Sequence, residues 1–280
     1  MKKEVLKEDL LRSTTDRLKT CVSGSARLEA TMLLDAAGDN LDVFERLVLR
    51  RLAGEPVDRI IGQRGFWTQE LIVTADTLSP RADTETIVEA ARDHAIKNGA
   101  VEGDARKAAF RILDLGTGTG AILLALLHEL PHATGVGVDV SHAALAVATR
   151  NAALNKLEAR AVFQHGDWAT GITEAFDIVV SNPPYIRSGD IAGLEREVRD
   201  HDPVLALDGG ADGLDAYRIL LPLLPRIMKP KGIAVFEIGF GQGPDIAALA
   251  ALAHLHIEET REDLGGVPRA VVMSLKALVS

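Results

Sequence analysis

The chain has 280 residues, 47% of them apolar, and a formal net charge of −9. A chain of this length and composition can bury a full core, as one large domain or as a large and a small one, which excludes wholesale disorder. The acidic balance argues against a protein that grips nucleic acid over a broad basic face.

The sequence shows no segment that would direct the chain to a membrane or out of the cell. Its single cysteine, Cys21, excludes an internal disulfide and suits a reducing compartment. The charged segment from Met1 to Leu10 lacks the apolar core of a signal peptide, and no apolar run approaches the ~18 residues of a spanning helix. We therefore expect a cytoplasmic monomer that contacts neither a membrane nor, directly, nucleic acid.

Residues 1–64 are predicted to form a small N-terminal helical domain. Apolar positions recur at helical spacing in successive sets, which are Leu6, Leu10, Leu11 and Leu18, then Leu28, Met32, Leu33 and Leu34, then Leu41, Phe44, Leu47, Val48 and Leu52. Acidic and basic residues roughly balance in this region. We interpret it as a module that docks a substrate.

Residues 65–79 are predicted to form a β-hairpin linker, because Phe66–Val73 is aromatic and β-branched with turn signals around it. After the linker, Asp83 is a candidate helix N-cap and Glu85 lies in the first turn. Two interpretations of Arg81 and Glu85 stay open. They form either a local ion pair at the helix start or part of a lid over an adjoining cleft.

Residues 80–280 are predicted to form an α/β domain, because strand and helix patterns alternate from Arg111 onward. The expected strands are Arg111–Leu115, Thr134–Asp139, Arg160–Gln164, Phe176–Ser181 and Gly232–Ile238, with helices at Ala121–Leu130 and His142–Leu154. Two further runs, His256–Arg261 and Arg269–Ala277, look like a terminal antiparallel pair. Together, these strands predict a doubly wound, mostly parallel, seven-stranded sheet.

A glycine-rich turn closes the first of these strands. Its glycines allow tight turns and a close approach to a ligand, and the spacing is G-x-G-x-G, not the G-x-G-x-x-G of pyrophosphate binders. Asp139 ends the second strand, ~20 residues downstream, where an acidic residue can bond ribose hydroxyls. A nucleoside ligand is therefore indicated, against the alternatives of close helix–strand packing for the glycines and N-capping for Asp139. The candidate residues are Gly116, Thr117, Gly118, Thr119, Gly120 and Asp139.

The third strand is followed by Gly166, Asp167 and Trp168. The Trp168 ring offers a face for an adenine, and Asp167 or nearby backbone offers an acceptor for its amino group. The alternative is a tryptophan that fills the edge of the domain.

The fourth strand is followed by Asn182, Pro183, Pro184 and Tyr185. Consecutive prolines cannot continue a central strand, so the chain leaves the sheet at Asn182. A side-chain amide, two carbonyls and an aromatic ring then lie at the carboxyl end of a strand, where open α/β sheets bind ligands. With the strand order 3-2-1-4-5, the glycine turn and Asn182 face the same crevice. The alternative is a rigid turn in which Asn182 bonds its own backbone.

The combination of these two motifs resembles the S-adenosylmethionine-dependent amino-methyltransferases, which act on adenine, guanine or glutamine amide nitrogens. A wider match, from about Ala26 to Arg269, resembles the HemK/PrmC family, the glutamine methyltransferases of peptide chain release factors. The segments that carry it are Gly54–Pro56, Ile61–Gly62, Phe66–Trp67, Leu78–Glu85, Asn182–Ile186, Ala206–Leu214 and Glu237–Gly239. Asp202-Pro203, where Glu-Pro is usual, and Ser79, where an apolar residue is common, depart from the family without touching Asn182–Tyr185.

The resemblance implies a class I, Rossmann-like methyltransferase fold and S-adenosyl-L-methionine as cofactor, held by the glycine turn, Asp139, Trp168 and Asn182, with no metal. It implies class 1 peptide chain release factors as protein partner, with Asn182–Tyr185 as the catalytic residues that hold the glutamine of a Gly-Gly-Gln motif. Acceptors on Asn182 and on Pro183 or Pro184 can orient the two N–H bonds of that amide, and Tyr185 can stack on it. Orientation of this type supplies up to ~7–11 kcal/mol.

Rival functions stay open at this point. The same chemistry on a ribosomal-protein glutamine fits the motifs equally well. A DNA or RNA amino-methyltransferase would need a basic target-binding region, and a nicotinamide oxidoreductase would need a different glycine spacing. A non-catalytic adaptor with this fold would not need an intact Asn182–Tyr185.

Overall fold

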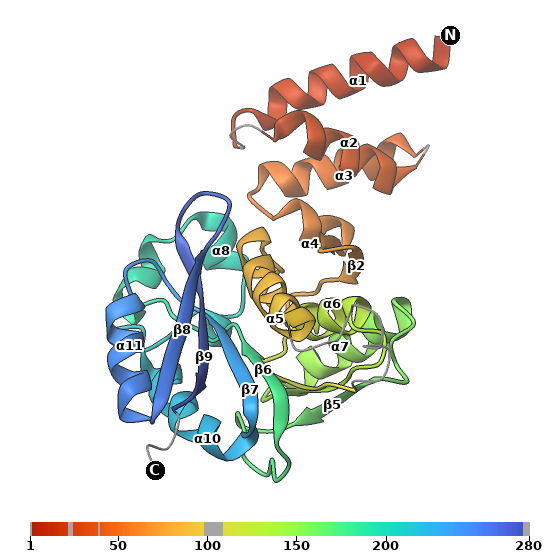
Figure 1. The fold of residues 1–280 in the computed structure, drawn as a ribbon. Coiled ribbons are helices and arrows are strands. Elements are labelled where there is room, and N and C mark those ends of the chain that lie inside the picture. The colour runs from red at the N-terminus through yellow and green to blue at the C-terminus, as the bar shows by residue number, and fades with distance from the viewer. Residues whose placement is uncertain (1, 22–24, 39, 98–108, 277–280) are drawn as a thin grey trace.

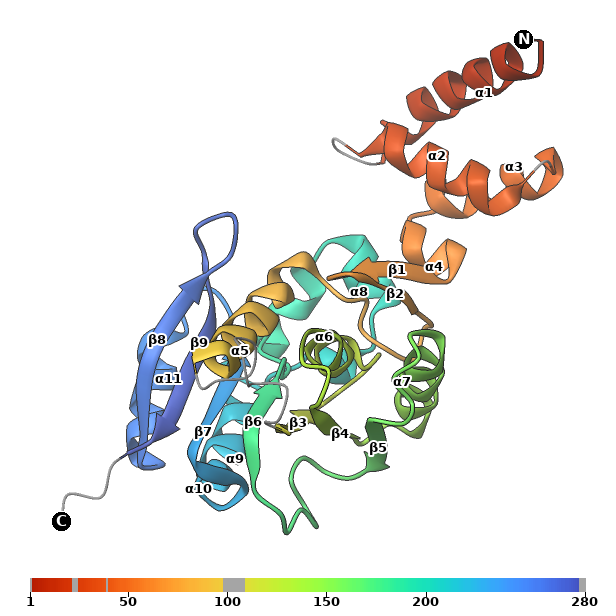
Figure 2. The ribbon, with the colours of Figure 1, turned by 45° about the vertical axis from the view of Figure 1, so that its right-hand side comes forward.

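The computed structural model describes residues 2–21, 25–38, 40–97 and 109–276 (Figure 1). Met1 and Ala277, at the ends of two predicted segments, lie outside these ranges. Within them, a group of N-terminal helices stands to one side of a larger α/β body that contains the last strands (Figures 1 and 2).

The N-terminal group consists of α1 (Lys2–Leu18), α2 (Ala26–Ala37), α3 (Leu41–Leu52) and α4 (Val57–Ile61). The three apolar sets found in the sequence fall on α1, α2 and α3. Leu18, Leu33, Phe44 and Val48 are at most 1% exposed and belong to one apolar cluster, separate from those of the sheet. Asn40 caps α3, since its Oδ1 accepts the N–H groups of Asp42 and Val43 at 3.1 Å. These helices therefore have their own core.

A β-hairpin follows, as predicted, but it begins earlier than the aromatic run. Its strands are β1 (Gln63–Phe66) and β2 (Gln69–Ile72), paired antiparallel. Asn151 of the α/β body bonds the backbone of Ile72 twice, accepting its N–H at 2.7 Å and donating to its carbonyl at 3.1 Å. The hairpin is thereby attached to the larger body.

The sheet has the predicted seven strands, and the first five lie in the predicted order. They are β3 (Arg111–Leu115), β4 (Thr134–Asp139), β5 (Ala161–His165), β6 (Phe176–Ser181), β7 (Met228–Glu237), β8 (Leu255–Glu262) and β9 (Pro268–Leu275). Their spatial order is β5-β4-β3-β6-β7-β9-β8. The first five strands in this order run parallel, and β9 pairs antiparallel with both β7 and β8. Three strand predictions match to the residue. The predicted third strand is shifted by one, and the fifth starts at Met228 instead of Gly232.

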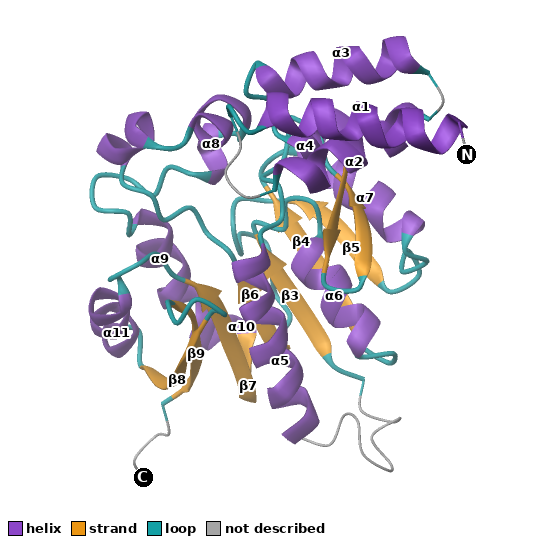
Figure 3. Cartoon of the chain, turned by 90° about the horizontal axis from the view of Figure 1, so that it is seen from above, coloured by secondary structure: helices purple, strands orange, loops and turns teal. Residues whose placement is uncertain are grey.

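Helices cover both faces of this sheet (Figure 3). They are α5 (Glu85–Lys97), α6 (Ala121–Glu129) and α7 (His142–Leu154) on one face, and α9 (Asp215–Leu220), α10 (Leu224–Ile227) and α11 (Gly243–Leu252) on the other. Neighbouring strand residues alternate between two apolar clusters, as in Ile112 and Leu113 of β3. Because helices cover both faces of the sheet, the strands are apolar at nearly every position of the sequence.

The helix α6 is apolar around most of its surface. Residues Ala121–Leu127 are all buried, because α6 packs between β3, β4, β5 and α5. None of the helices in the described ranges combines the length and the apolar character that a membrane crossing requires.

Between β6 and α9 the chain makes an excursion that we name the cover segment, residues 186–214. It contains short 3₁₀ turns and the helix α8 (Arg196–His201). Ion pairs attach it to the N-terminal helices: Arg51 of α3 reaches Glu197 at 2.5 Å, and Arg59 of α4 reaches Asp202 at 2.8 Å. The N-terminal helices and the cover segment are therefore directly connected.

Candidate active site

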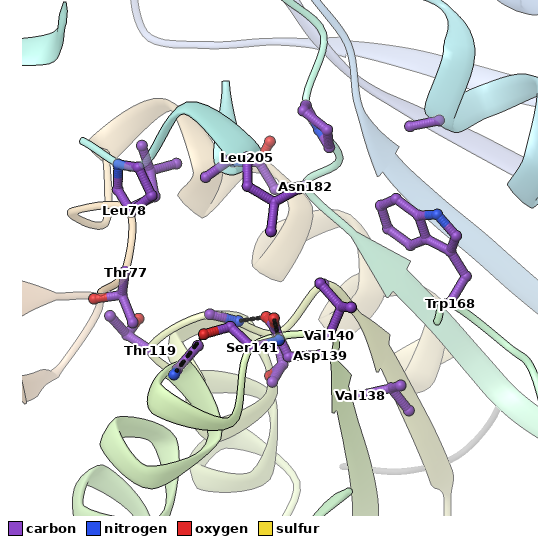
Figure 4. Close-up of a pocket in the computed structure, with 18 of the residues that line it drawn as sticks. Thr77, Leu78, Thr119, Val138, Asp139, Val140, Ser141, Trp168, Asn182 and Leu205 are labelled. Carbon is purple, nitrogen blue, oxygen red and sulfur yellow. Dashed lines mark hydrogen bonds between the residues drawn. The ribbon is translucent and has the colours of Figure 1, made fainter. Parts of the chain in front are cut away.

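A cavity of about 460 Å³ lies at the carboxyl ends of β3, β4 and β6 (Figure 4). The residues of the sequence prediction that line it are Gly116, Thr117, Gly118, Thr119, Asp139, Gly166, Asp167, Trp168, Asn182 and Pro184. Gly120, Pro183 and Tyr185 do not. Motifs far apart in the chain thus meet around one space, because the strand order reverses between β3 and β6.

The glycine turn has a backbone conformation that suits glycine. Gly116 and Gly118 have φ of +73° and +53°, which residues with a Cβ rarely adopt. The N–H of Gly118 donates to Asp139 Oδ2 at 2.9 Å, and Asp139 Oδ1 accepts the N–H of Ser141 at 2.9 Å. Ser141, not Asp139, is the N-cap of α7. Asp139 therefore fixes the turn while it lines the cavity.

A second acidic residue, Asp114 on β3, lies behind the turn and received no role from the sequence. Its Oδ2 accepts the hydroxyl of Thr117 at 2.7 Å, whereas Oδ1 is buried with no hydrogen-bond partner. Burial raises the pKa of Asp114 to about 7, against a smaller lowering by the Thr117 bond. In the sequence, only the short spacing between Asp114 and Thr117 could have indicated this contact.

Trp168 lies against the glycine turn. Its φ is +51°, and its ring comes within 3.4 Å of the point where a Cβ on Gly116 would stand. The ring also packs on the apolar cluster of one sheet face. The indole therefore fills the domain edge, as the alternative interpretation expects, and it also borders the cavity, while its contact with an adenine stays a prediction.

Asn182 borders a second cavity as well, of about 340 Å³. This one is lined on the far side of Asn182 by Tyr185, Ile186, Leu194, Glu195, Val198 and Leu207. Pro184 faces the first cavity only, and Tyr185 the second only. Asn182 thus lies at the junction of two spaces. The cover segment borders both of them, and the glycine turn borders only the first.

Two buried residues that sequence reasoning missed lie behind Asn182. Asn182 Nδ2 donates to Thr84 Oγ1 at 3.1 Å, and Thr84 Oγ1 donates to Glu237 Oε2 at 2.6 Å. The Tyr185 hydroxyl donates to Glu237 Oε1 at 3.2 Å. Burial raises the pKa of the Glu237 carboxyl and, with the nearby Glu237 charge, that of the Tyr185 hydroxyl.

The glycines of the cover segment allow it to lie close to the Pro184–Tyr185 backbone. A Cβ on Gly209 would stand 2.8 Å from the Pro184 carbonyl oxygen, and one on Gly213 would stand 2.4 Å from that of Tyr185. Gln242 connects these two segments, because its Nε2 donates to the Tyr185 carbonyl at 3.2 Å and to the Gly213 carbonyl at 3.0 Å. The run Ala206–Leu214 is therefore a support for the Asn182 turn.

Glu85 lies in the first turn of α5 as expected, but the N-cap and the local ion pair expected there are wrong. Asp83 makes no N-cap bond and instead pairs with Arg269 at 3.3 Å. Arg81 and Glu85 form no ion pair with each other, since Arg81 pairs with Asp202 at 3.2 Å and Glu85 accepts the N–H of Trp67 at 2.7 Å. Partners distant in sequence prevail over the local ones. Arg81 does border both cavities.

The strand order, the glycine turn and the cavity at the switch point define a class I, S-adenosylmethionine-dependent type of methyltransferase fold. Within the described ranges, no group of three or more His, Cys, Asp or Glu side chains is arranged to hold a metal ion.

Comparisons with known proteins support this class and narrow it. The family model of the methyltransferase small domain matches residues 103–198. A ribosomal protein L11 methylase from Lactobacillus delbrueckii subsp. bulgaricus has a similar fold, with a TM-score of 0.50 and 19% identity over 76% of this chain and 89% of its own. At this identity the likeness concerns the fold alone.

Two curated relatives are much more similar in sequence. The release factor glutamine methyltransferase of Rhodospirillum rubrum is 48% identical over 85% of this chain and 70% of its own length. That of Bradyrhizobium diazoefficiens is 42% identical over 94% of this chain and 93% of its own. The chain belongs to the family of release factor glutamine methyltransferases, as the sequence motifs had indicated.

Proposed function

We propose that this enzyme methylates the side-chain amide nitrogen of the glutamine in the Gly-Gly-Gln motif of class 1 peptide chain release factors, with S-adenosyl-L-methionine as donor. The family supports a glutamine of a release factor as the target. The observation that carries the proposal is the position of Asn182, which borders both cavities. One cavity takes the donor, the other the target, and the reaction occurs where they meet.

The first cavity fits the donor in size and chemistry. Its volume of about 460 Å³ lies in the range of small-molecule sites. Asp139 offers acceptors for ribose hydroxyls, the glycine turn lets the backbone approach the nucleoside, and Trp168 offers a flat face to the adenine. When bound, S-adenosylmethionine supplies an electrophilic methyl group on a sulfonium.

In the second cavity, Asn182 and its neighbours hold the target amide. Asn182 Oδ1 accepts one N–H of the amide, and the backbone carbonyl of Pro183 or Pro184 accepts the other. Tyr185 packs on the amide plane. The amide nitrogen forms the new bond to carbon, the electrons of the old bond stay on sulfur, and the charged amide releases its proton to water. The acceptors favour the positive charge as it develops.

The N-terminal helices and the hairpin have roles in binding the release factor as a whole protein. We propose that residues 1–64 dock the release factor, that residues 65–79 link this domain to the catalytic domain, residues 80–280, and that the enzyme works as a cytoplasmic monomer. The ion pairs of Arg51 and Arg59 support this division of roles, since they connect the proposed docking helices to the cover segment of the target cavity.

The test is mass spectrometry of purified release factor after incubation with this enzyme and S-adenosylmethionine. We expect one added methyl group on the glutamine of the Gly-Gly-Gln peptide, and none on a release factor in which that glutamine is replaced by glutamate. Parallel reactions contain ribosomal proteins or nucleic acid. Methylation in either of these, with an unmodified release factor, would refute the proposal.

A further inference from the structure

A buried chain of hydrogen bonds runs from Asn182 to the carboxyl end of β7. It passes from Asn182 Nδ2 to Thr84 Oγ1 at 3.1 Å and from Thr84 Oγ1 to Glu237 Oε2 at 2.6 Å. Thr84 and Glu237 are 4% and 1% exposed, so water does not compete for these bonds. Glu237 borders neither cavity and Thr84 borders only the first, whereas the target amide is proposed to lie in the second.

The direction of each bond follows from Glu237. Both of its carboxyl oxygens accept a hydroxyl proton, one from Thr84 and one from Tyr185. The two hydroxyl bonds and the Arg269 charge favour the ionised form of Glu237 against its burial. A carboxylate has no proton to return. Thr84 has a single hydroxyl proton, which it donates to Glu237, so that its oxygen can only accept. Asn182 must then turn its NH₂ group toward Thr84.

We infer that Glu237 and Thr84 are positioning residues that fix which end of the Asn182 amide faces the substrate. The inference rests on the proposed function, because it concerns the same target amide. With Nδ2 held by Thr84, Asn182 presents Oδ1, an acceptor, to the N–H groups of the target. A rotated Asn182 would present NH₂ to NH₂, two donors facing each other.

The first experiment replaces the acceptor-only group. In Glu237→Gln, Tyr185 still donates to the amide oxygen at position 237, so the new NH₂ faces Thr84. Thr84 then accepts from Gln and donates to Asn182, which must rotate. We expect kcat for release factor to fall by roughly 10²-fold, the size of effect seen when one oriented polar group is lost at a reacting centre. Cofactor Kd and Tm should change little.

A pair of variants at Thr84 keeps the test valid if Glu237→Gln folds poorly. Thr84→Ser retains the hydroxyl and should retain kcat, whereas Thr84→Val removes it at nearly constant volume and should lower kcat without a matching rise in KM. A merely structural role predicts equal kcat in the two variants once both are folded, and that outcome would overturn the inference. So would a wild-type kcat in folded Glu237→Gln.

A double variant tests the direction of the bonds themselves. Asn182→Asp alone surrounds the single Thr84 proton with two carboxylates and should be inactive. In the double variant Asn182→Asp with Glu237→Gln, Gln donates to Thr84, Thr84 donates to Asp, and the free Asp oxygen again faces the substrate. We expect the double variant to be more active than either single variant. A double variant no better than the worse single one would contradict the polarity argument.

The wild-type enzyme is assayed on the same release factor throughout. Absence of methylation by the wild type would count against the proposed function, whereas loss confined to the variants, beside an active wild type with unchanged cofactor binding, concerns the positioning network alone.

Discussion

Arg59 and Asp202 form a buried ion pair between the N-terminal helices and the cover segment. Arg59 Nη2 lies 2.8 Å from Asp202 Oδ1, and the two side chains are only 5% and 6% exposed. Asp202 Oδ2 also accepts from Arg81, which borders both cavities, at 3.2 Å. One carboxylate therefore joins the proposed docking helices to the wall of the site. The family usually has the longer Glu at this position, but Asp202 still reaches both guanidinium groups.

The first prediction concerns this carboxylate. Asp202→Ala leaves the Arg59 guanidinium, two of whose nitrogens already lack partners, as an uncompensated buried charge. We expect a loss of about 3–5 kcal/mol in the free energy of unfolding, measured by urea denaturation. The matched control is Asp200→Ala on α8, whose exposed ion pairs with Arg196 and Arg199 contribute little. Equal costs at the two positions would show that the buried pair is not important for stability.

The second prediction concerns Asn182 itself. Asn182→Ala removes the acceptor for the target amide but leaves Asp139, Trp168 and the glycine turn in place. We expect methyl transfer to fall by about 10²–10³-fold while S-adenosylmethionine affinity, measured by calorimetry, changes little. Asn155→Ala is the control, because among the described residues its side chain bonds only the backbone of Glu70 and Asn151, away from both cavities. Full activity in Asn182→Ala would refute its proposed role.

The third prediction concerns Trp168. Trp168→Ala removes the aromatic face beside Gly116, and we expect cofactor Kd to rise about tenfold, since aromatic contacts contribute ~0.5–1.5 kcal/mol beyond the area they bury. The chain has two tryptophans, so Trp67→Phe leaves Trp168 as the sole tryptophan, which is excited selectively at wavelengths that tyrosine does not absorb. Titration of that variant with S-adenosylmethionine should quench its fluorescence. Constant emission at saturating cofactor would place Trp168 outside the binding site.

These predictions differ in how much of their basis was visible in the sequence. The run Phe176–Ser181 predicted β6 to the residue, because a strand buried on both faces is apolar throughout and Asn182-Pro183 ends it abruptly. Strand order followed from alternation and chain reversal, and it brought Asn182 to the glycine turn as expected.

The supports of the site were not predictable in the same way. Thr84 and Glu237 lie 153 residues apart, and no periodicity or spacing links them. Asp83 and Glu85 had plausible local roles at a helix start, but tertiary partners, Arg269 and the Trp67 N–H, replaced those roles. Local pattern predicts where a strand ends. It does not predict which buried polar group, contributed by another segment, will satisfy the residue at that end.

The last prediction concerns stability against pH and Asp114. Burial raises the pKa of Asp114 from 3.8 to about 7 in the folded protein. Between these values the unfolded chain is ionised while the folded chain keeps the proton, so stability falls as pH rises through this window and levels off above about pH 7. The full shift corresponds to about 4 kcal/mol.

Asp114→Asn, which carries no charge, should lack this slope. Its stability relative to the wild type should therefore increase by about 2–3 kcal/mol between pH 5 and pH 8, measured by urea denaturation at each pH. The same substitution at the exposed Asp190 should follow the wild-type curve. Parallel curves for Asp114→Asn and the wild type would mean that the buried carboxyl is compensated by groups other than Thr117.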